Sequence, residues 1–304
     1  MEQNNCHTIK CVTPLDMDFP DRLRDIPDCP NVLYIRGKLP DPKRPTVGII
    51  GSRNASQYGL NMARHFASCL SDAGVQIISG MARGIDGVSQ RTAMEAGHPT
   101  FGILGCGVDV LYPKENRDLF MRIPERGGLI SEFPPGTQPV AKFFPSRNRI
   151  ISGLSDILLV VEARIKSGTG ITVRRALEQG RDVYAVPGRI TDPLSAGCNR
   201  LIADGAGTAL SPDVILEALG IYPENVPGTS LISGGVREND KRVRLAKDEK
   251  MVYSFLDLYP KTLDELVCIT DLSVQKLLPV LLQLMMKGLV AEAGKNNYYR
   301  KSQG

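Results

Sequence analysis

The segment Val47-Gly-Ile-Ile-Gly-Ser-Arg-Asn-Ala-Ser-Gln-Tyr58 passes from a short apolar run, through a glycine turn, into a helical pattern that continues to Leu70. The apolar run predicts a buried parallel strand at 47–50. Ser56 is the expected N-cap of the helix, because its hydroxyl can accept a hydrogen bond from a free amide of the first turn. A strand that enters a helix in this way points free amides and the positive end of the helix dipole at the turn.

The residues within this turn have the chemistry of an anion site. Gly51 and Ser52 allow a close approach to the backbone, and Arg53 adds a fixed positive charge. We therefore expect a phosphate-binding loop formed by Gly51, Ser52, Arg53 and Ser56. The alternative is a tight turn without a ligand, in which the arginine pairs with a nearby carboxylate.

Strand and helix patterns alternate from residue 47 to about residue 220. We expect strands at 47–50, 75–79, 100–104, 128–131, 157–162 and 182–186, and helices near 57–73, 84–96, 114–122, 147–154, 169–179 and 212–219. Most of these strands are continuous apolar runs, which is typical of a parallel sheet covered on both faces. The prediction is an α/β fold with a doubly wound, mostly parallel sheet, and ligands of such sheets bind at the carboxyl ends of the strands.

The segments on either side predict further units. Residues 1–46 are interpreted as an N-terminal extension that packs on the core, with a short helix and an edge strand within Pro30–Gly37. Residues 221–246 are rich in proline and glycine and carry a charged run, which predicts a linker. The pattern of residues 247–304 predicts three short helices followed by a β-hairpin wing, which is typical of a small winged-helix domain.

Composition narrows the classes of protein. The chain has 304 residues, a net charge of +4 and seven cysteines without a CxxC pair. We expect a reduced, cytoplasmic protein with neither disulfides nor a zinc site. It has no apolar run of eighteen residues and no signal-peptide pattern, so no membrane association is expected.

The sequence gives little support to an enzyme or to a bound cofactor. A GxGxxG dinucleotide motif and a GxxxxGK[ST] P-loop are both absent, and Cys106 between two glycines is interpreted as a buried thiol. Ser167-Gly168-Thr169 lies at a strand-to-helix junction and can bind phosphate. It resembles the glycine-threonine loop of lysine-decarboxylase-like nucleotide glycosidases, although Ile171-Thr-Val follows where their catalytic glutamate is expected. A nucleotide-processing hydrolase is therefore kept as the alternative function.

The segment Lys142-Phe-Phe-Pro-Ser-Arg-Asn-Arg149 has the composition that single-stranded nucleic acid requires. Cations follow the phosphates, and aromatic faces stack on unpaired bases at roughly 1–3 kcal/mol per base. The alternative is a loop anchored by its phenylalanines, with arginines paired to Glu132, Glu162 or Asp156. The candidate contacts are Lys142, Phe143, Phe144, Arg147, Asn148 and Arg149.

Other cations are expected on loops at the same edge of the sheet. They are Arg53, Arg83, Arg164 and Lys166. A basic rim beside two aromatic rings favours an extended polyanion as the ligand.

Several motifs together resemble one family, the DprA (Smf) DNA-processing proteins of natural transformation. They include Gly51-Ser-Arg, Ser79-Gly-x-Ala-x-Gly-Ile-Asp86, Leu104-Gly-Cys-Gly-Val-Asp-x-x-Tyr-Pro113, Phe144-Pro-x-Arg-Asn-Arg-Ile-Ile-Ser-Gly-Leu154 and Ala185-Val-Pro-Gly188. The match runs in the same order from about residue 12 to 300.

The resemblance implies an extended Rossmann fold that binds single-stranded DNA. It further implies a homodimer that protects incoming strands and loads RecA recombinase, without catalysis or a cofactor. The family's phosphate loop corresponds to Ser52, Arg53 and Ser56, and its strand groove to residues 142–149.

Two departures from the family pattern occur. Ser89-Gln90 replaces Ala-His after the Gly-Ile-Asp motif, and Gly170 is an extra glycine in Ser167-Gly-Thr-Gly-Ile-Thr172, which is expected to weaken the start of that helix. The candidate recognition helix of the winged domain, 273–287, carries few cations. This favours a protein-contact or auxiliary role over duplex reading by a transcriptional regulator.

Overall fold

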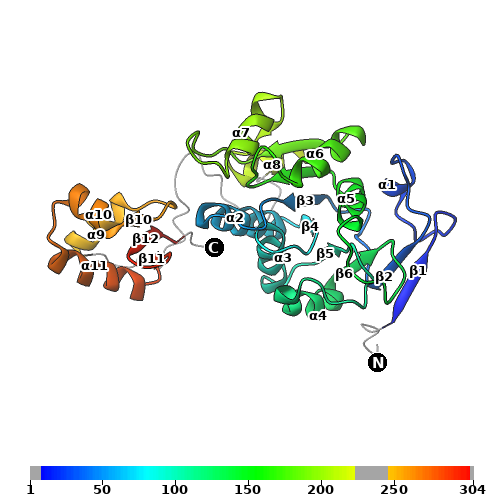
Figure 1. Ribbon diagram of the computed structural model, residues 1–304, viewed down its shortest axis with the longest axis horizontal. Coiled ribbons are helices and arrows are strands. Elements are labelled where there is room, and N and C mark those ends of the chain that lie inside the picture. Colours follow the sequence, from blue (N-terminus) through cyan, green and yellow to red (C-terminus); the bar gives the residue numbers. More distant parts are fainter. Residues whose placement is uncertain (1–7, 223–245, 302–304) are drawn as a thin grey trace. The chain divides into compact units, whose positions relative to one another are not determined.

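The computed structural model describes residues 8–222 and 246–301 (Figure 1). The chain divides into two compact units, Met1–Val226 and Pro227–Gly304. Most of the predicted linker, 221–246, lies outside the described residues, and the domain boundaries stay a prediction.

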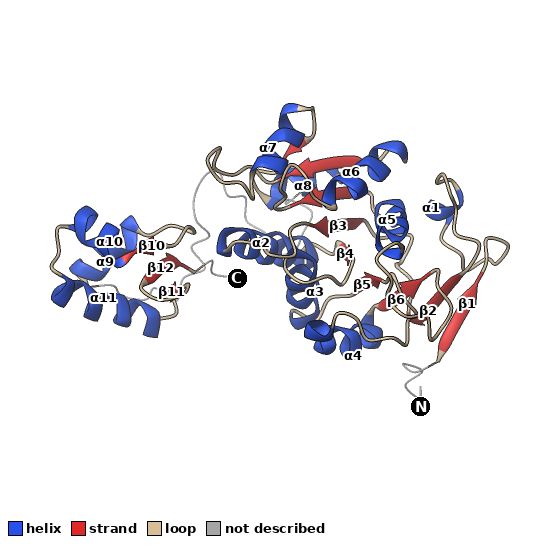
Figure 2. Ribbon diagram, in the orientation of Figure 1, coloured by secondary structure: helices blue, strands red, loops and turns tan. Residues whose placement is uncertain are grey.

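The first unit is built on a nine-stranded sheet in the order β1-β2-β6-β5-β4-β3-β7-β8-β9 (Figure 2). Two antiparallel strands, β1 (Ile9–Val12) and β2 (Leu33–Gly37), precede a parallel set. The parallel strands are β3 (Thr46–Ile50), β4 (Gln76–Ser79), β5 (Thr100–Ile103), β6 (Gly128–Ser131), β7 (Ile157–Val160), β8 (Asp182–Ala185) and β9 (Gly207–Thr208). This confirms the predicted doubly wound, mostly parallel sheet.

Helices cover both faces of this sheet (Figure 1). One apolar layer lies beneath α2 (Gln57–Asp72), α3 (Ile85–Glu95), α4 (Arg117–Arg126) and α8 (Pro212–Ala218). The other lies beneath α1 (Asp21–Arg24), α5 (Phe143–Leu154), α6 (Thr169–Glu178) and α7 (Ala196–Ala203). A single 3₁₀ turn, η1 (Lys114–Asn116), precedes α4. Burial of both faces explains why the strands are apolar throughout.

The chain reverses its winding direction between β3 and β7. From β3 the connections lead outward through β4, β5 and β6, and then α5 returns the chain to β7 on the other side of β3. Loops after β3 and β7 consequently diverge at the carboxyl edge, where open α/β sheets bind their ligands. The loop 51–56 lies at this switch point.

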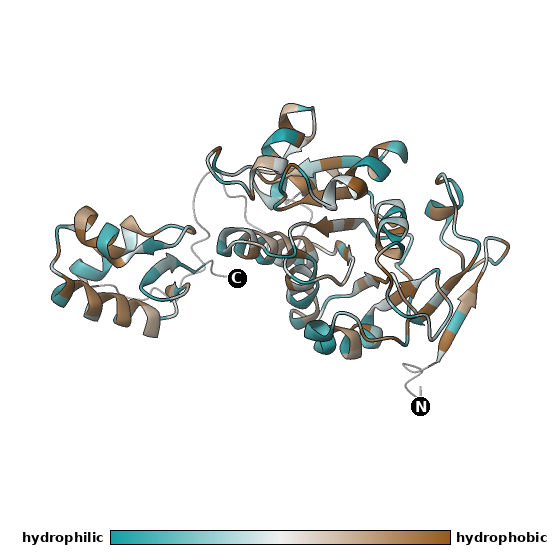
Figure 3. Cartoon of the chain, viewed as in Figure 1, coloured by the Kyte–Doolittle hydropathy of each residue, from teal (hydrophilic) through white to brown (hydrophobic). Residues whose placement is uncertain are grey.

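The second unit is the predicted winged helix. Its helices are α9 (Lys247–Phe255), α10 (Leu263–Thr270) and α11 (Val274–Met286), and its small sheet pairs β10 (Lys261–Thr262), β12 (Asn297–Arg300) and β11 (Val290–Glu292). Thr262 caps α10: its hydroxyl accepts from the Glu265 amide at 3.1 Å, and the Glu265 carboxylate accepts from the Thr262 amide. Figure 3 shows α11 as a largely hydrophobic helix.

Three sequence-based expectations for the first unit were wrong or incomplete. The strand within Pro30–Gly37 is not at the edge, because β1 pairs with it on its outer side. Helix α5 begins at Phe143 and not near residue 147, because Pro145 falls in the first turn, where a missing amide costs no helical bond. Helix α7 and strands β1 and β9 are too short to give a periodic signal.

Within residues 8–222 and 246–301, no helix is long and apolar enough to cross a membrane.

Candidate nucleic-acid interface

The loop after β3 is held tightly against the start of α3. A Cβ at Gly51 would lie 2.7 Å from Ile85 Cγ1, and a Cβ at Gly84 would lie 2.2 Å from the Ser52 carbonyl oxygen. Gly84 also has a φ of +75°, which favours glycine. The Ile85 amide donates to the Ser52 carbonyl at 3.2 Å. This packing fixes the backbone at Arg53 while its side chain stays exposed.

Ser56 is the N-cap of α2, as predicted, but its polar atoms have partners within the protein. The Ser56 hydroxyl accepts from the Gly59 amide at 3.1 Å and donates to Glu162 Oε1 at 2.6 Å. The Ser56 amide donates to Glu162 Oε2 at 2.8 Å. A buried carboxylate of the protein therefore lies at the helix end where the sequence predicted phosphate, which leaves Ser56 without a free donor for a ligand.

The segment 142–149 forms the first turns of α5 and carries an aromatic cluster, which we define as Tyr112, Phe133, Phe143 and Phe144. Phe143 stacks on Phe133 with ring centroids 4.2 Å apart, and Phe144 lies 5.4 Å from Tyr112. Both phenylalanines of α5 are half-buried, and Tyr112 is 40% exposed. Aromatic surface is thus presented to solvent at this edge.

Arg53, Phe144 and Arg147 come together although they are far apart in sequence. The guanidinium carbons of Arg53 and Arg147 lie 5.8 and 5.9 Å from the Phe144 ring centroid. The exposed Lys142 lies over Phe143, with its Nζ 5.4 Å from that ring centroid. This geometry places exposed cations beside aromatic faces, as the sequence predicted for a single-strand site.

Arg147 is part of the interior. It is 4% exposed, and one terminal nitrogen donates to the carbonyl of Gly80 at 2.7 Å and to that of Ile103. Burial lowers the pKa of Arg147 to about 10, with nearby Arg53 acting in the same direction and Asp86 opposing. Burial disfavours the charged form of Asp86 as well and so raises its pKa, although Arg147 opposes this shift. The geometry favours a role for Arg147 in joining α5 to the ends of β4 and β5.

Arg149 takes the alternative role that the sequence allowed. Its two terminal nitrogens each donate to a carboxylate oxygen of Glu132 at 2.7 Å, and its Nε donates to the Asp28 carbonyl at 2.7 Å. The residue is 8% exposed. With all its donor groups engaged and little exposed surface, Arg149 forms a structural ion pair, and its contact with DNA stays a prediction.

The remaining predicted residues lie at the same edge of the sheet. Arg83 is exposed and pairs with Glu115 at 3.5 Å, whereas Asn148 is half-buried and accepts from Arg147 Nε at 3.2 Å. The β7 loop carries exposed Arg164 and Lys166 and leads through Ser167 and Gly168 to Thr169, the first residue of α6. Their participation in a DNA site stays a prediction.

The two departures from the family pattern differ in their surroundings: Gln90 has a structural role, and nothing in the structure explains the glycine at 170. Gln90 is buried and joins two elements, because its amide oxygen accepts from the Met81 amide at 3.2 Å and its amide nitrogen donates to the Phe101 carbonyl at 2.9 Å. The position of Gly170 faces open space, since a Cβ there would meet nothing within 4 Å.

Sequence reasoning missed two aromatic residues at this edge and the role of a third residue, Glu162. Tyr112 and Phe133 complete the aromatic cluster, and Glu162 holds Ser56. Of the three, Tyr112 lies within a motif of the family resemblance, residues 104–113. Without the fold, however, no local spacing indicates that they lie beside α5 or α2.

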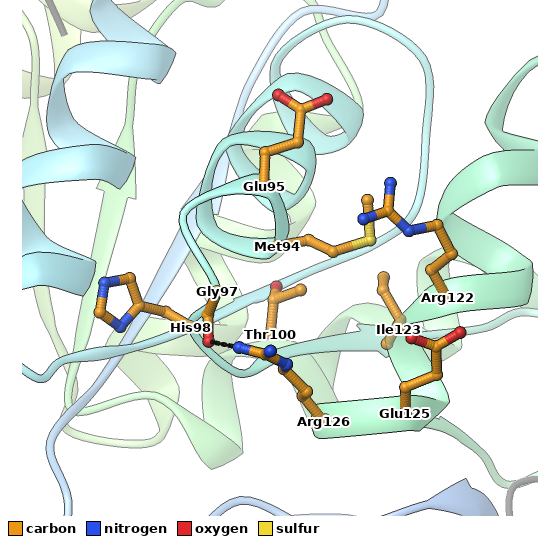
Figure 4. Close-up of a pocket in the computed structure, with 10 residues that line it drawn as sticks. Met94, Glu95, Gly97, His98, Thr100, Arg122, Ile123, Glu125 and Arg126 are labelled. Carbon is orange, nitrogen blue, oxygen red and sulfur yellow. Dashed lines mark hydrogen bonds between the residues drawn. The ribbon is translucent and has the colours of Figure 1, made fainter.

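The opposite edge of the sheet has a separate small pocket (Figure 4). It measures about 190 Å³ and is lined mainly by the end of α3, the start of β5 and the end of α4, including His98, Arg122 and Arg126. Arg126 reaches across to the Gly97 carbonyl at 2.5 Å. This pocket lies at the amino ends of the strands and is distinct from the candidate interface.

Among the described residues, no group of three or more histidine, cysteine, aspartate or glutamate side chains is arranged to hold a metal ion. Cys106 is buried as expected, and burial raises the pKa of its thiol to about 11.

The fold and the site together define a doubly wound α/β protein with an exposed basic and aromatic edge, followed by a winged-helix unit. Residues 10–220 match the family described as DNA recombination-mediator protein A, and residues 238–294 match the DprA winged helix domain. The chain belongs to the DprA/Smf family of DNA recombination mediators.

Related proteins support this assignment. Protein Smf of Synechocystis is 33% identical over 99% of this chain and 82% of its own length. DNA processing protein DprA of Streptococcus pneumoniae is 42% identical over 67% of this chain and 72% of its own length.

Two solved structures share the fold. That of DprA from Streptococcus pneumoniae has a TM-score of 0.65 and 38% identity, covering 70% of this chain and 75% of the other. DNA processing protein A from Helicobacter pylori, studied for its unique single-stranded DNA binding mode, has a TM-score of 0.62 and 26% identity, covering 71% and 97%.

Proposed function

We propose that this protein is a non-enzymatic, sequence-tolerant single-stranded DNA-binding protein. In this proposal it protects incoming strands and loads RecA recombinase during natural transformation and recombination. It acts in the cytoplasm as a homodimer and requires no cofactor. Membership of a recombination-mediator family and the single-strand binding of the Helicobacter pylori relative support the proposal.

One observation carries the proposal: the convergence of Arg53 with Phe144 at the topological switch point of the sheet. Phosphates of a single strand would contact Arg53 and Lys142, and unpaired bases would contact the aromatic cluster. Neither interaction requires a particular base, because every nucleotide has a phosphate and every base has a π-face. The predicted ligand is therefore a single strand of any sequence.

A titration of labelled oligo-dT at two salt concentrations tests the site. Arg53→Ala is expected to weaken binding at least about tenfold and to reduce the salt slope by about one. Arg122→Ala is the matched control, because Arg122 is exposed at the opposite edge of the sheet. Equal affinities of wild type and Arg53→Ala would refute the site.

Loading of RecA requires its own experiment. We expect the protein to speed RecA filament formation on single strands that are already coated by a single-strand binding protein. Arg53→Ala should lose this effect in proportion to its loss of DNA affinity. If the wild-type protein binds oligo-dT but does not accelerate filament formation, it binds single strands and does not load RecA.

The alternative hydrolase rests on Ser167, Gly168 and Thr169 before α6. It requires release of a free base from a nucleoside monophosphate, and an assay that detects no base excludes it.

Duplex reading by the winged helix requires higher affinity for double-stranded than for single-stranded DNA. The described part of α11 carries one charged side chain, Lys276, which favours an auxiliary or protein-contact role for this unit.

A further inference from the structure

The amino end of α2 is closed by the carboxylate of Glu162. Both of its oxygens accept hydrogen bonds from Ser56, one from the amide and one from the hydroxyl. The Glu162 carbonyl also accepts from the Ser52 amide at 2.7 Å. One residue of the β7 loop thus holds the β3 loop on both sides of Arg53.

The surrounding glycines make room for this residue. A Cβ at Gly59 would lie 2.6 Å from Glu162 Oε2, and a Cβ at Gly51 would lie 2.9 Å from the Glu162 carbonyl oxygen. A side chain at position 59 would therefore displace the carboxylate. Contact with Glu162 explains the glycine at 59, and contacts with Ile85 and Glu162 together explain the glycine at 51, without any ligand.

The charge of Glu162 is held in an unfavourable place. The residue is 1% exposed, and burial raises its pKa, with Asp192 adding to the shift while the Ser56 bonds and Arg164 oppose it. A buried anion at a helix amino end occupies the place that a bound phosphate takes in nucleotide-binding relatives of this fold class. A phosphate at this helix end would have to displace Glu162.

We propose that Glu162 is the positioning residue of the interface: its carboxylate fills the anion site of α2 and fixes the loop 51–56, so that the exposed Arg53 side chain contacts the nucleic-acid backbone. This inference rests on the proposed function. It assigns phosphate recognition to the Arg53 side chain and excludes the amino end of α2 as the phosphate site. Such a contact slides along a strand more readily than a closed phosphate pocket, in accord with a sequence-tolerant binder.

The test is a double-mutant cycle on oligo-dT binding by the full chain. Glu162→Gln should weaken binding about fivefold or more, and the double variant with Arg53→Ala should bind about as weakly as Arg53→Ala alone. Gly59→Ala, which displaces the carboxylate but keeps its charge, should show the same coupling to Arg53. Circular dichroism melting confirms that each variant is folded at the assay temperature.

Asp156→Asn is the matched control. Asp156 also accepts from a backbone amide, that of Thr46 at 2.8 Å, but at the opposite end of β3 and β7. Its replacement should change stability without coupling to Arg53. Independent, multiplicative losses for Glu162→Gln and Arg53→Ala, or full affinity in folded Glu162→Gln, would overturn the role of Glu162. Failure of the wild type to bind would instead overturn the proposed function.

Discussion

At the scale of single residues, the cations of the segment 142–149 differ in role because of what surrounds them. Arg149 lies against Glu132 and Arg147 against two backbone carbonyls, so both are interior groups. Lys142, at the amino end of the same helix, is exposed. Sequence composition counts these three cations alike, whereas only an exposed cation is accessible to a phosphate without breaking internal bonds.

Loss of Arg149 is expected to cost stability. Arg149→Ala would leave Glu132 as an unpaired, largely buried carboxylate, so the free energy of unfolding of the first unit should fall by about 3 kcal/mol. Urea denaturation followed by circular dichroism measures this. Lys142→Ala is the matched control, with an expected change below about 0.5 kcal/mol; equal effects of the two substitutions would contradict the assignment.

The raised pKa of Glu162 predicts a pH dependence with a definite sign. A carboxyl group with a folded pKa above its ordinary value of 4.5 holds its proton more tightly in the folded chain. The contribution of Glu162 to the stability of the folded chain therefore becomes less favourable as the pH rises from about 4 through the folded pKa. The stability of wild type relative to Glu162→Gln should be greater at pH 4 than at pH 7, measured by urea denaturation. A constant difference across this range would disprove the predicted shift.

At the scale of elements, α5 has a functional and a structural side. Its first turn presents Phe143 and Phe144 to the carboxyl edge, while later residues such as Ile150 and Leu154 are buried against the sheet. Pro145 is compatible with this start because it lies in the first turn. The helix thus holds Phe143 and Phe144 in fixed positions, although the composition of this segment is typical of a loop.

Replacement of Phe144 by leucine tests whether that surface stacks on bases. Phe144 packs closely on Gly105, where an added Cβ would lie 2.9 Å from the Phe144 ring. Leucine keeps most of this apolar contact but removes the flat face of the ring. Affinity for oligo-dT should fall about fivefold or more, as expected for one lost stacking contact. Anisotropy of a labelled oligonucleotide measures this, with Phe120→Leu, at a buried position of α4, as the control. Equal losses for the two variants would indicate a general effect of packing.

At the scale of the whole molecule, the two units have separate cores. The winged unit is packed around Leu266, Leu277, Leu281 and Leu284, and the first unit around its sheet. Leu281→Ala should destabilise the second unit by about 2–5 kcal/mol. Amide exchange should then increase within residues 246–301 and stay unchanged within 8–222.

The same variant addresses the role of the winged helix. If the candidate interface lies entirely in the first unit, Leu281→Ala should bind oligo-dT within about twofold of wild type. A much larger loss would show that the winged unit contributes to the affinity. The comparison requires only anisotropy titrations of the two full-length proteins.

The fold class, the parallel strands and the winged helix could be predicted from the sequence alone. Continuous apolar runs and helical spacings are local patterns, and they report burial wherever both faces of a sheet are covered. The family resemblance was equally readable, because its motifs lie at strand ends in a fixed order. Short elements such as β1 and β9 gave no such signal, since two to four residues are too few for a period.

The roles of individual polar residues were decided only by the tertiary structure. Glu132 and Arg149 are 17 positions apart, and Ser56 and Glu162 are 106 apart. Whether a charge faces solvent or a partner depends on which distant residue the fold places beside it, and no local pattern encodes that neighbour. Arg53 beside Phe144 is thus a product of the sheet order, in which the loop after β3 and the first turn of α5 meet at one edge.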